Sequence, residues 1–275
     1  MRRRTLRRLI DWGISILVAT VALFPIYWGL VTSLKPTKRI LALPPSLVPH
    51  HITFAHYEAI VRGGVFGYLE NTIIVSAGTV LLCLTLGLLG GYAVARFAFR
   101  GRKAFQVLIL GLMSIPIASL LIPSFSLLFR IGLLDTRLGL VLLYSAYQLP
   151  LVLWLLAGFI DTVPEALEHA ALVDGYSRWG ILYRITLPLS RPALVAAGLL
   201  VLTFAWNDFV VAVVMISSNE VKTLPVGIYD FLGYFGRDWG ALTASAMVSA
   251  VPVIALFVFF QRYFLSGMTS GGIKG

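Results

Sequence analysis

The chain has 275 residues, of which 59% are hydrophobic and only 12% charged, and its mean hydropathy is +0.89. Soluble domains carry roughly 25% charged residues, so this composition excludes an ordinary soluble protein and indicates that lipid covers most of the surface. The net charge of +10 comes from short basic clusters between apolar runs, a pattern typical of membrane proteins that disfavours nucleic-acid binding. The single cysteine, Cys83, lies inside an apolar run, where we expect it to pack.

Six apolar runs reach the roughly 20 residues that a helix needs to cross a bilayer. We therefore expect an all-α membrane protein with a single transmembrane domain over residues 1–275 and six transmembrane helices. The expected spans are about residues 13–34, 72–95, 104–129, 138–160, 192–217 and 241–261. Pro116 and Pro123 predict a kinked third span, whose freed carbonyls neighbouring helices satisfy.

Orientation follows from where Lys and Arg collect in the short loops. With a cytoplasmic N-terminus, 14 of the 22 basic residues lie inside, which favours both termini being cytoplasmic. An arginine-rich start before an apolar run also fits a secretory signal. The run is longer than the roughly 7–15 residues of a signal core, and no cleavage site follows before Lys35, so we expect an uncleaved first span.

The longest outside loop, residues 35–71, is rich in proline and carries three histidines. It can either tether two spans or meet an external partner, and composition does not decide between these readings. His50, His51 and His56 lack the fixed spacing or the cysteines of a metal site, so we expect a solvated loop without metal.

The least apolar cytoplasmic stretch, residues 161–191, contains start and stop signals for two short helices. Thr162 and Glu165 have the spacing of a capping box, with Pro164 in the first turn. Gly175 predicts a left-handed residue that ends the first helix, Ser177 a cap for the second, and Pro188 a stop near Leu187. We expect a bent helix pair projecting between the fourth and fifth spans.

Two readings of this pair remain open. It can lie on the inner leaflet, with Arg178, Arg184 and Arg191 on lipid headgroups and Trp179 and Tyr183 at the interface. Alternatively, it can dock a cytoplasmic protein through a small apolar surface, formed by Leu167, Ala170, Ala171 and Leu172.

The same stretch resembles a family signature. Ala170 and Ala171, then Asp174 and Gly175, and later Leu187 and Pro188 have the order and spacing of the cytoplasmic motif in permease subunits of binding-protein-dependent ABC importers. The family has Glu where this chain has His169, with Glu168 immediately before it, so the acidic contact is either shifted by one residue or replaced.

Further motifs are similar to the maltose-type carbohydrate uptake branch of that family, and together they cover essentially the whole chain. They are residues 32–36 (TSLKP), 91–96 (GYAVAR), 206–208 (WND), 223–227 (TLPVG) and the tail 267–275.

The resemblance implies an ATP-driven importer and the other members of its assembly. It implies a second homologous permease, two ATPase subunits, an extracytoplasmic solute-binding protein and surrounding lipid in a bacterial or archaeal cytoplasmic membrane. ATP and Mg would bind the partner ATPase and no cofactor would bind this chain, which lacks a phosphate-binding Gly-x-x-x-x-Gly-Lys-Ser/Thr motif and is not expected to be an enzyme.

Particular residues follow from the resemblance and from the spans. The implied ATPase-coupling residues are Glu168, His169, Ala170, Ala171, Asp174 and Gly175, and the implied tail contacts are Thr269, Ser270 and Lys274. Candidates for a sugar pathway are Tyr144, Tyr147, Gln148, Asn207 and Asp208. For the tyrosines ordinary packing remains an alternative, and for Asn207 and Asp208 a role as interhelical glue. Asp208 is the only formal charge inside a span, so it must face protein or water.

Gly87 and Gly91 have the spacing of a close helix–helix contact, which we expect to be packing. A stand-alone ion-coupled transporter is the alternative function, but it needs several ionisable groups within the spans or broken helices from an internal repeat. An intramembrane enzyme needs paired acids or a nucleophile with a base, and neither is visible in the spans.

Overall fold

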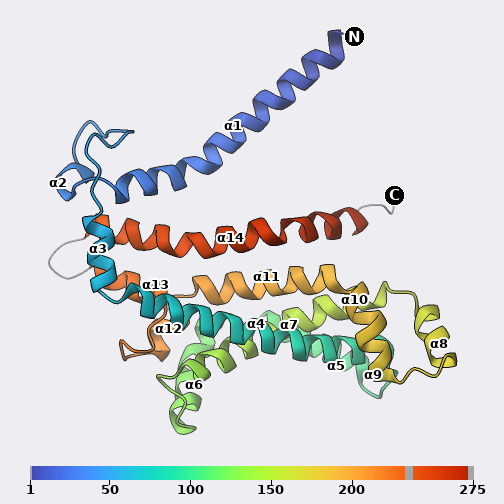
Figure 1. Cartoon of the computed structure of the whole chain (residues 1–275). Coiled ribbons are helices and arrows are strands. Elements are labelled where there is room, and N and C mark those ends of the chain that lie inside the picture. Colours follow the sequence, from blue (N-terminus) through green and yellow to red (C-terminus); the bar gives the residue numbers. More distant parts are fainter. Residues whose placement is uncertain (1, 233–237, 272–275) are drawn as a thin grey trace. The chain divides into compact units, whose positions relative to one another are not determined.

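Every element in the described part of the chain is a helix (Figure 1). The computed structural model describes the backbone of residues 2–232 and 238–271 and the side chains of residues 10–231 and 238–259. The α helices are α1 (Arg2–Ser33), α2 (Thr37–Ile40), α3 (Ala55–Arg62), α4 (Val65–Arg96), α5 (Arg102–Met113), α6 (Ile117–Arg130), α7 (Arg137–Asp161), α8 (Glu165–Val173), α9 (Arg178–Ile181), α10 (Leu187–Leu189), α11 (Arg191–Asn207), α12 (Val210–Met215), α13 (Leu224–Tyr229) and α14 (Trp239–Gly271). The tail residues Thr269, Ser270 and Lys274 lie outside the described side chains.

Four helices are long and apolar enough to cross a membrane: α1 from Ile10, α4, α7 and α14 up to Phe259. Two bent pairs, α5 with α6 and residues 178–189 with α11, raise the number to six if each pair is one span. The all-helical prediction is therefore confirmed, with four to six membrane helices.

The third expected span breaks where proline predicted a bend. α5 ends at Met113 and α6 begins at Ile117, and their axes differ by 98°. Pro116 has no N–H to continue the helix and takes an extended ψ of 128°. Pro123, by contrast, lies inside α6. The bend is therefore sharper than the predicted kink, and it separates two helices instead of bending one.

The fifth expected span is also interrupted, at the acidic residue. α11 ends at Asn207, Asp208 is extended with ψ 124°, and the short α12 begins at Val210. The Asp208 carboxylate accepts hydrogen bonds from the backbone N–H groups of Val211 and Ala212 at 3.1 and 3.0 Å. It thereby satisfies amide groups that a helix start leaves without partners.

The contacts of the chain group into two compact units. Unit 1 comprises residues 1–66 and 227–254, and unit 2 comprises residues 67–226 and 255–275. The core of unit 2 packs α4 against α7 and α11, with Cys83, Val152, Leu156, Ile160 and Val201 buried together. The predicted packing role of Cys83 is confirmed.

Glycine lets α4 and α7 approach closely in this core. A Cβ on Gly91 would lie 3.0 Å from the Ala157 backbone nitrogen and 3.2 Å from the Leu156 Cβ. The expected close contact is therefore confirmed, because only a residue without a side chain fits against a neighbouring backbone.

The opposite end of unit 2 is joined by side chains that bind backbone groups. The Asn71 amide at the start of α4 donates to the carbonyls of Glu220 and Lys222 at 2.9 and 2.8 Å. The Leu224 N–H donates to the Thr72 hydroxyl at 2.7 Å. The segment after α12 is thus fixed to α4.

A second set of hydrogen bonds joins the loop before α7 to the residues that follow α12. Asp135 has a left-handed φ of 59°, and its carboxylate accepts from the N–H groups of Ser217 and Ser218 at 2.9 and 3.1 Å and from the Ser218 hydroxyl at 3.1 Å. Partial burial raises the pKa of Asp135, but these hydrogen bonds to the charged form outweigh it and hold the pKa below its usual value.

Asp135→Asn tests the contribution of the charged Asp135 carboxylate to these hydrogen bonds, because Asn tolerates the same backbone conformation but carries no charge. A folded-state pKa below the unfolded value means that stabilisation is present above about pH 4 and is lost as pH falls through the lowered pKa. We expect the melting temperature of the purified variant to be about 2–4 °C lower at pH 7, for a loss of about 1 kcal/mol. The difference should shrink as the pH falls through the lowered pKa of Asp135; a difference independent of pH would contradict the account.

In unit 1 the TSLKP segment organises the loop that follows α1. The Lys35 ammonium is buried, donates to the Ser46 carbonyl at 2.6 Å and lies 4.6 Å from the centre of the Trp28 ring. His56 is also buried and its Nε2 lies 2.9 Å from the Lys35 carbonyl oxygen. The expectation of a solvated histidine is wrong for His56, and no metal-binding cluster exists among the residues that were searched, those described in the structure.

Candidate functional site

The loop between α7 and α11 starts differently from the predicted capping box. The Thr162 hydroxyl donates back to the Phe159 carbonyl at 2.7 Å, because Thr162 ends α7 rather than starting α8. α8 begins at Glu165 after Pro164, without a side-chain cap. Glu165 and Glu168 do lie in the first turn, where the helix dipole favours negative charge.

The predicted turn and second cap are confirmed. Gly175 has a φ of +84°, its N–H donates to the Leu172 carbonyl at 3.1 Å, and the Tyr176 N–H donates to the Ala171 carbonyl at 2.9 Å. These two bonds and the left-handed glycine form a Schellman motif, which closes α8. The Ser177 hydroxyl then accepts from the Gly180 N–H at 3.1 Å and caps α9.

Proline does not stop the second helix where expected. The helix continues from Arg178 through a π-helical turn, Leu182–Thr186, and through Pro188 to Leu189. The wider turn pairs the Leu187 N–H with the Leu182 carbonyl, and Pro188 follows it in the chain. A bend of 75° at Ser190 then leads into α11.

The outer face of α8 is exposed and partly apolar. Val173 is 88% exposed and Leu167 47% exposed, with His169, Ala170 and Asp174 also exposed between them. Ala171 is buried. A single exposed apolar residue is ordinary on a protein surface. This face, however, has two exposed apolar residues, Leu167 and Val173, beside the acidic Asp174 and the fixed turn at Gly175.

The inner face of α8 carries a buried carboxylate. The side chains of Glu168 and Arg96 are 2% and 4% exposed, and the Arg96 Nε donates to Glu168 Oε1 at 2.8 Å. The Tyr92 and Thr186 hydroxyls each donate to Glu168 at 3.1 Å. Arg96 also donates to the Val163 carbonyl at 2.7 Å, so the last turn of α4 holds both ends of the α7–α8 connection.

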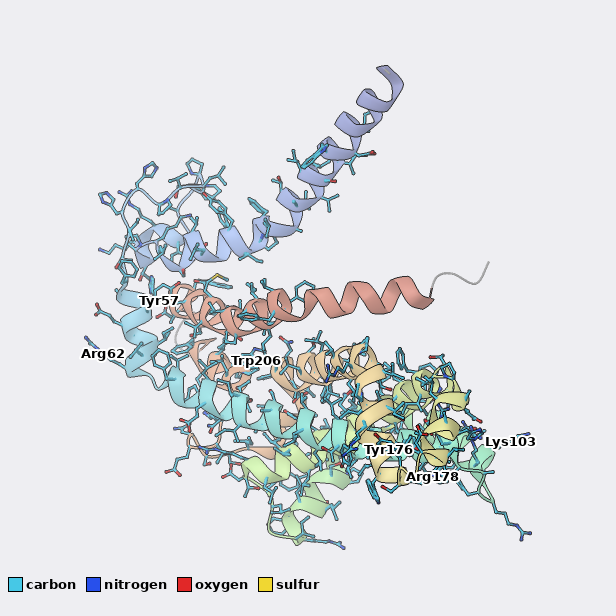
Figure 2. The ribbon with its side chains drawn as sticks, turned by 45° about the vertical axis from the view of Figure 1, so that its right-hand side comes forward. Tyr57, Arg62, Lys103, Tyr176, Arg178 and Trp206 are labelled. Atoms are coloured by element: carbon cyan, nitrogen blue, oxygen red, sulfur yellow. The ribbon has the colours of Figure 1, made fainter. Side chains whose placement is uncertain are left out.

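α9 adds basic and aromatic side chains to the same end of unit 2. Figure 2 shows Tyr176, Arg178 and Lys103 at this end, whereas Trp206 lies toward the far end of α11. The Arg178 guanidinium lies 5.7 Å from the centre of the Phe97 ring, just beyond α4. Trp179 and Tyr183 are stacked with ring centres 6.2 Å apart, and both are exposed.

The proposed pathway residues fall into two groups. Tyr144 is fully buried and its hydroxyl donates to the Asp208 carboxylate at 2.7 Å, which joins α7 to the α11–α12 break. The Tyr144–Asp208 contact is that of interhelical glue. The Asn207 amide, by contrast, donates to the Thr203 carbonyl at 2.8 Å within its own helix.

Tyr147 and Gln148 instead line a groove of about 260 Å³ beside the break between α5 and α6. Met113, Ile115 and Ile117 form the facing wall. The Tyr147 hydroxyl is 2.8 Å from the Ser124 hydroxyl, whereas no hydrogen-bond partner of the Gln148 amide occurs among the described residues.

Sequence reasoning missed Arg96, Tyr92 and Thr186 as partners of Glu168. Arg96 and Tyr92 belong to the GYAVAR motif, which recurs in the resembling family and was the available signal. Their distance from Glu168 along the chain, 72 and 76 residues, concealed the contact.

Comparisons with known proteins agree with this architecture. Residues 84–270 match the family described as "Binding-protein-dependent transport system inner membrane component". The chain is 35% identical to the trehalose/maltose transport system permease protein MalG of Thermococcus litoralis, with 100% of both chains covered. It is 36% identical to the trehalose transport system permease protein SugB of Mycobacterium tuberculosis, over 98% of this chain and 99% of that protein.

The fold also matches a solved transporter. One chain in the crystal structure of a bacterial ABC transporter involved in the import of the acidic polysaccharide alginate aligns with a TM-score of 0.80 at 23% identity, covering 96% of this chain and 98% of that one. At this identity the likeness establishes the fold alone.

Proposed function

The chain belongs to the binding-protein-dependent transport system inner membrane components, the permease subunits of ABC importers, and from this we propose that it imports a saccharide. ATP hydrolysis belongs to a separate ATPase subunit, so the chain itself is a multi-pass membrane component and not an enzyme. Full-length similarity to permeases for trehalose and maltose supports a di- or oligosaccharide as the solute.

We propose that α8 and the Gly175 turn dock in a cleft of the ATPase. The observation that carries this proposal is the exposed outer face of α8, with Leu167, Val173 and Asp174 presented beside a turn that the Schellman motif fixes. His169 lies on this face and Glu168 does not. The direct contacts would therefore come from His169, Ala170, Asp174 and Gly175.

The remaining assembly follows the same proposal. A second, homologous permease and this chain would form the pathway, two ATPase subunits would bind ATP and Mg, and an extracytoplasmic binding protein would deliver the solute. Both termini would be cytoplasmic, which places the α8 loop inside the cell in a bacterial or archaeal membrane. The tail residues Thr269, Ser270 and Lys274 stay as candidates for a second ATPase contact.

Within the membrane, the groove lined by Tyr147 and Gln148 is the part of the proposed pathway best suited to a sugar. Non-helical backbone is tolerated at membrane depth where it is buried in protein or lines a cavity, and the break between α5 and α6 faces this groove. The Gln148 amide can both donate to and accept from hydroxyl groups. Tyr144, Asn207 and Asp208 would shape the pathway by fixing the break after α11.

Gln148→Leu tests the pathway, because leucine has a similar size but cannot hydrogen-bond. We expect the KM for uptake of radiolabelled trehalose or maltose to rise about 2- to 10-fold, which corresponds to the loss of one net hydrogen bond. Gln106→Leu, in α5 and outside this groove, is the matched control and should retain the wild-type KM. An unchanged KM in Gln148→Leu, for a sugar that the wild type transports, would remove Gln148 from the pathway.

A further inference from the structure

The Glu168 carboxylate faces the interior of the protein, opposite the docking face of α8. The next two residues, His169 and Ala170, are exposed, whereas Glu168 is buried. A buried carboxylate is costly unless charged or hydrogen-bonded groups compensate it. Here Arg96, Tyr92 and Thr186 do so together.

This network joins three elements that are separate in the chain. Glu168 lies in the first turn of α8, Arg96 and Tyr92 in the last two turns of α4, and Thr186 in the π-helical turn that continues into α10. The 2.8 Å bond between Arg96 and Glu168 is charge-assisted, and such bonds are stronger than neutral ones. Breaking one side leaves an uncompensated buried charge, so the three elements are held as one body.

The positions of α8, α4 and α10 connect the docking face to the long helices of unit 2. α8 presents the docking face, α4 packs along α7 through the close contact at Gly91, and α10 leads into α11 through the 75° bend. Displacement of α8 therefore carries the end of α4 and the start of α11 with it.

We propose that Arg96 and Glu168 are positioning residues that transmit the movement of the ATPase from α8 to α4 and α11. This inference rests on the proposed docking of α8 to an ATPase. Tyr92 and Thr186 align the carboxylate, and the Arg96 bond to the Val163 carbonyl keeps the α7–α8 connection in register. Loss of the pair separates ATP hydrolysis from transport while the docking face stays intact.

The test uses the complete transporter, purified through this chain and reconstituted in proteoliposomes with radiolabelled trehalose or maltose. The variants are Arg96→Gln, Glu168→Gln and the double substitution. Glu165→Gln is the matched control on the same helix, because Glu165 is 64% exposed and 4.0 Å from Arg96. Three quantities are measured: the ATPase subunit retained, the rate of ATP hydrolysis, and sugar transported per ATP.

For each single variant we expect the ATPase to be retained and sugar transported per ATP to fall roughly 5- to 150-fold, the usual range of coupling between sites. The double variant should lose less than the two singles combined, because it leaves no unpaired buried charge. Arg96→Lys should recover only part of the ratio, since lysine cannot bond Glu168 and Val163 together through a planar group.

An unchanged ratio in both single variants would overturn the inference. So would loss of the ATPase in proportion to transport at a constant ratio, because that result assigns the pair to docking. If the single variants do not yield folded protein, Tyr92→Phe and Thr186→Val each remove one bond, and wild-type ratios in both would also overturn it. A wild-type chain that retains no ATPase would instead refute the proposed function on which the inference rests.

Discussion

Replacing Gly91 by valine is expected to lower the melting temperature of the purified chain by roughly 6–12 °C, for a loss of about 3 kcal/mol. The added Cβ would meet the Ala157 nitrogen at 3.0 Å and the Leu156 carbonyl carbon at 3.3 Å. Both are backbone atoms, which cannot rotate away as a flexible side chain can. α4 and α7 would have to separate, and the surrounding core would lose contacts.

Gly111→Val provides the control for this change. Gly111 is also helical, in α5, but a Cβ there would meet no atom within 4 Å. The same substitution should therefore leave the melting temperature within about 2 °C of the wild-type value. Equal destabilisation by both substitutions would show that the effect belongs to valine in a membrane helix rather than to the α4–α7 contact.

The combined substitution Asp174→Lys and Gly175→Pro is expected to reduce the co-purified ATPase at least about tenfold, which corresponds to 1.4 kcal/mol or more of binding free energy. Proline fixes φ near −65°, whereas Gly175 needs +84° to close the Schellman motif. Lysine reverses the charge on the exposed docking face. The measurement is the amount of ATPase that follows the tagged chain through purification.

Gly175→Asn separates the turn from the identity of the residue. Asparagine adopts the left-handed conformation more readily than other non-glycine residues, so the turn and the ATPase should both be retained. If Gly175→Asn and the combined substitution reduce the amount of co-purified ATPase equally, the ATPase does not recognise the geometry of the turn. If neither reduces it, α8 is not the docking element.

The local features of the coupling loop could be predicted because they depend on single residue types. Glycine at position 175 and serine at 177 specify a turn and a cap through their own backbone and hydroxyl preferences. The contact at Gly91 likewise follows from spacing on one helix face. The length of apolar runs indicated the membrane helices.

Features that depend on tertiary contacts could not be predicted in this way. The inward direction of Glu168 requires knowing that Arg96, 72 residues earlier, ends beside it. The break at Asp208 depends on the Tyr144 hydroxyl and on the N–H groups of the following helix. The passage of the helix through Pro188 depends on a π-helical turn that no residue pattern in that segment indicated.

The most direct test of the central claim is affinity purification of the wild-type chain from its native membrane under gentle solubilisation, followed by reconstitution with internal ATP as the energy source. The account predicts that an ATPase co-purifies and that labelled sugar moves only when ATP is hydrolysed and the binding protein is present. Purification without any ATPase, together with uptake driven by an ion gradient alone, would contradict it and would identify a stand-alone transporter.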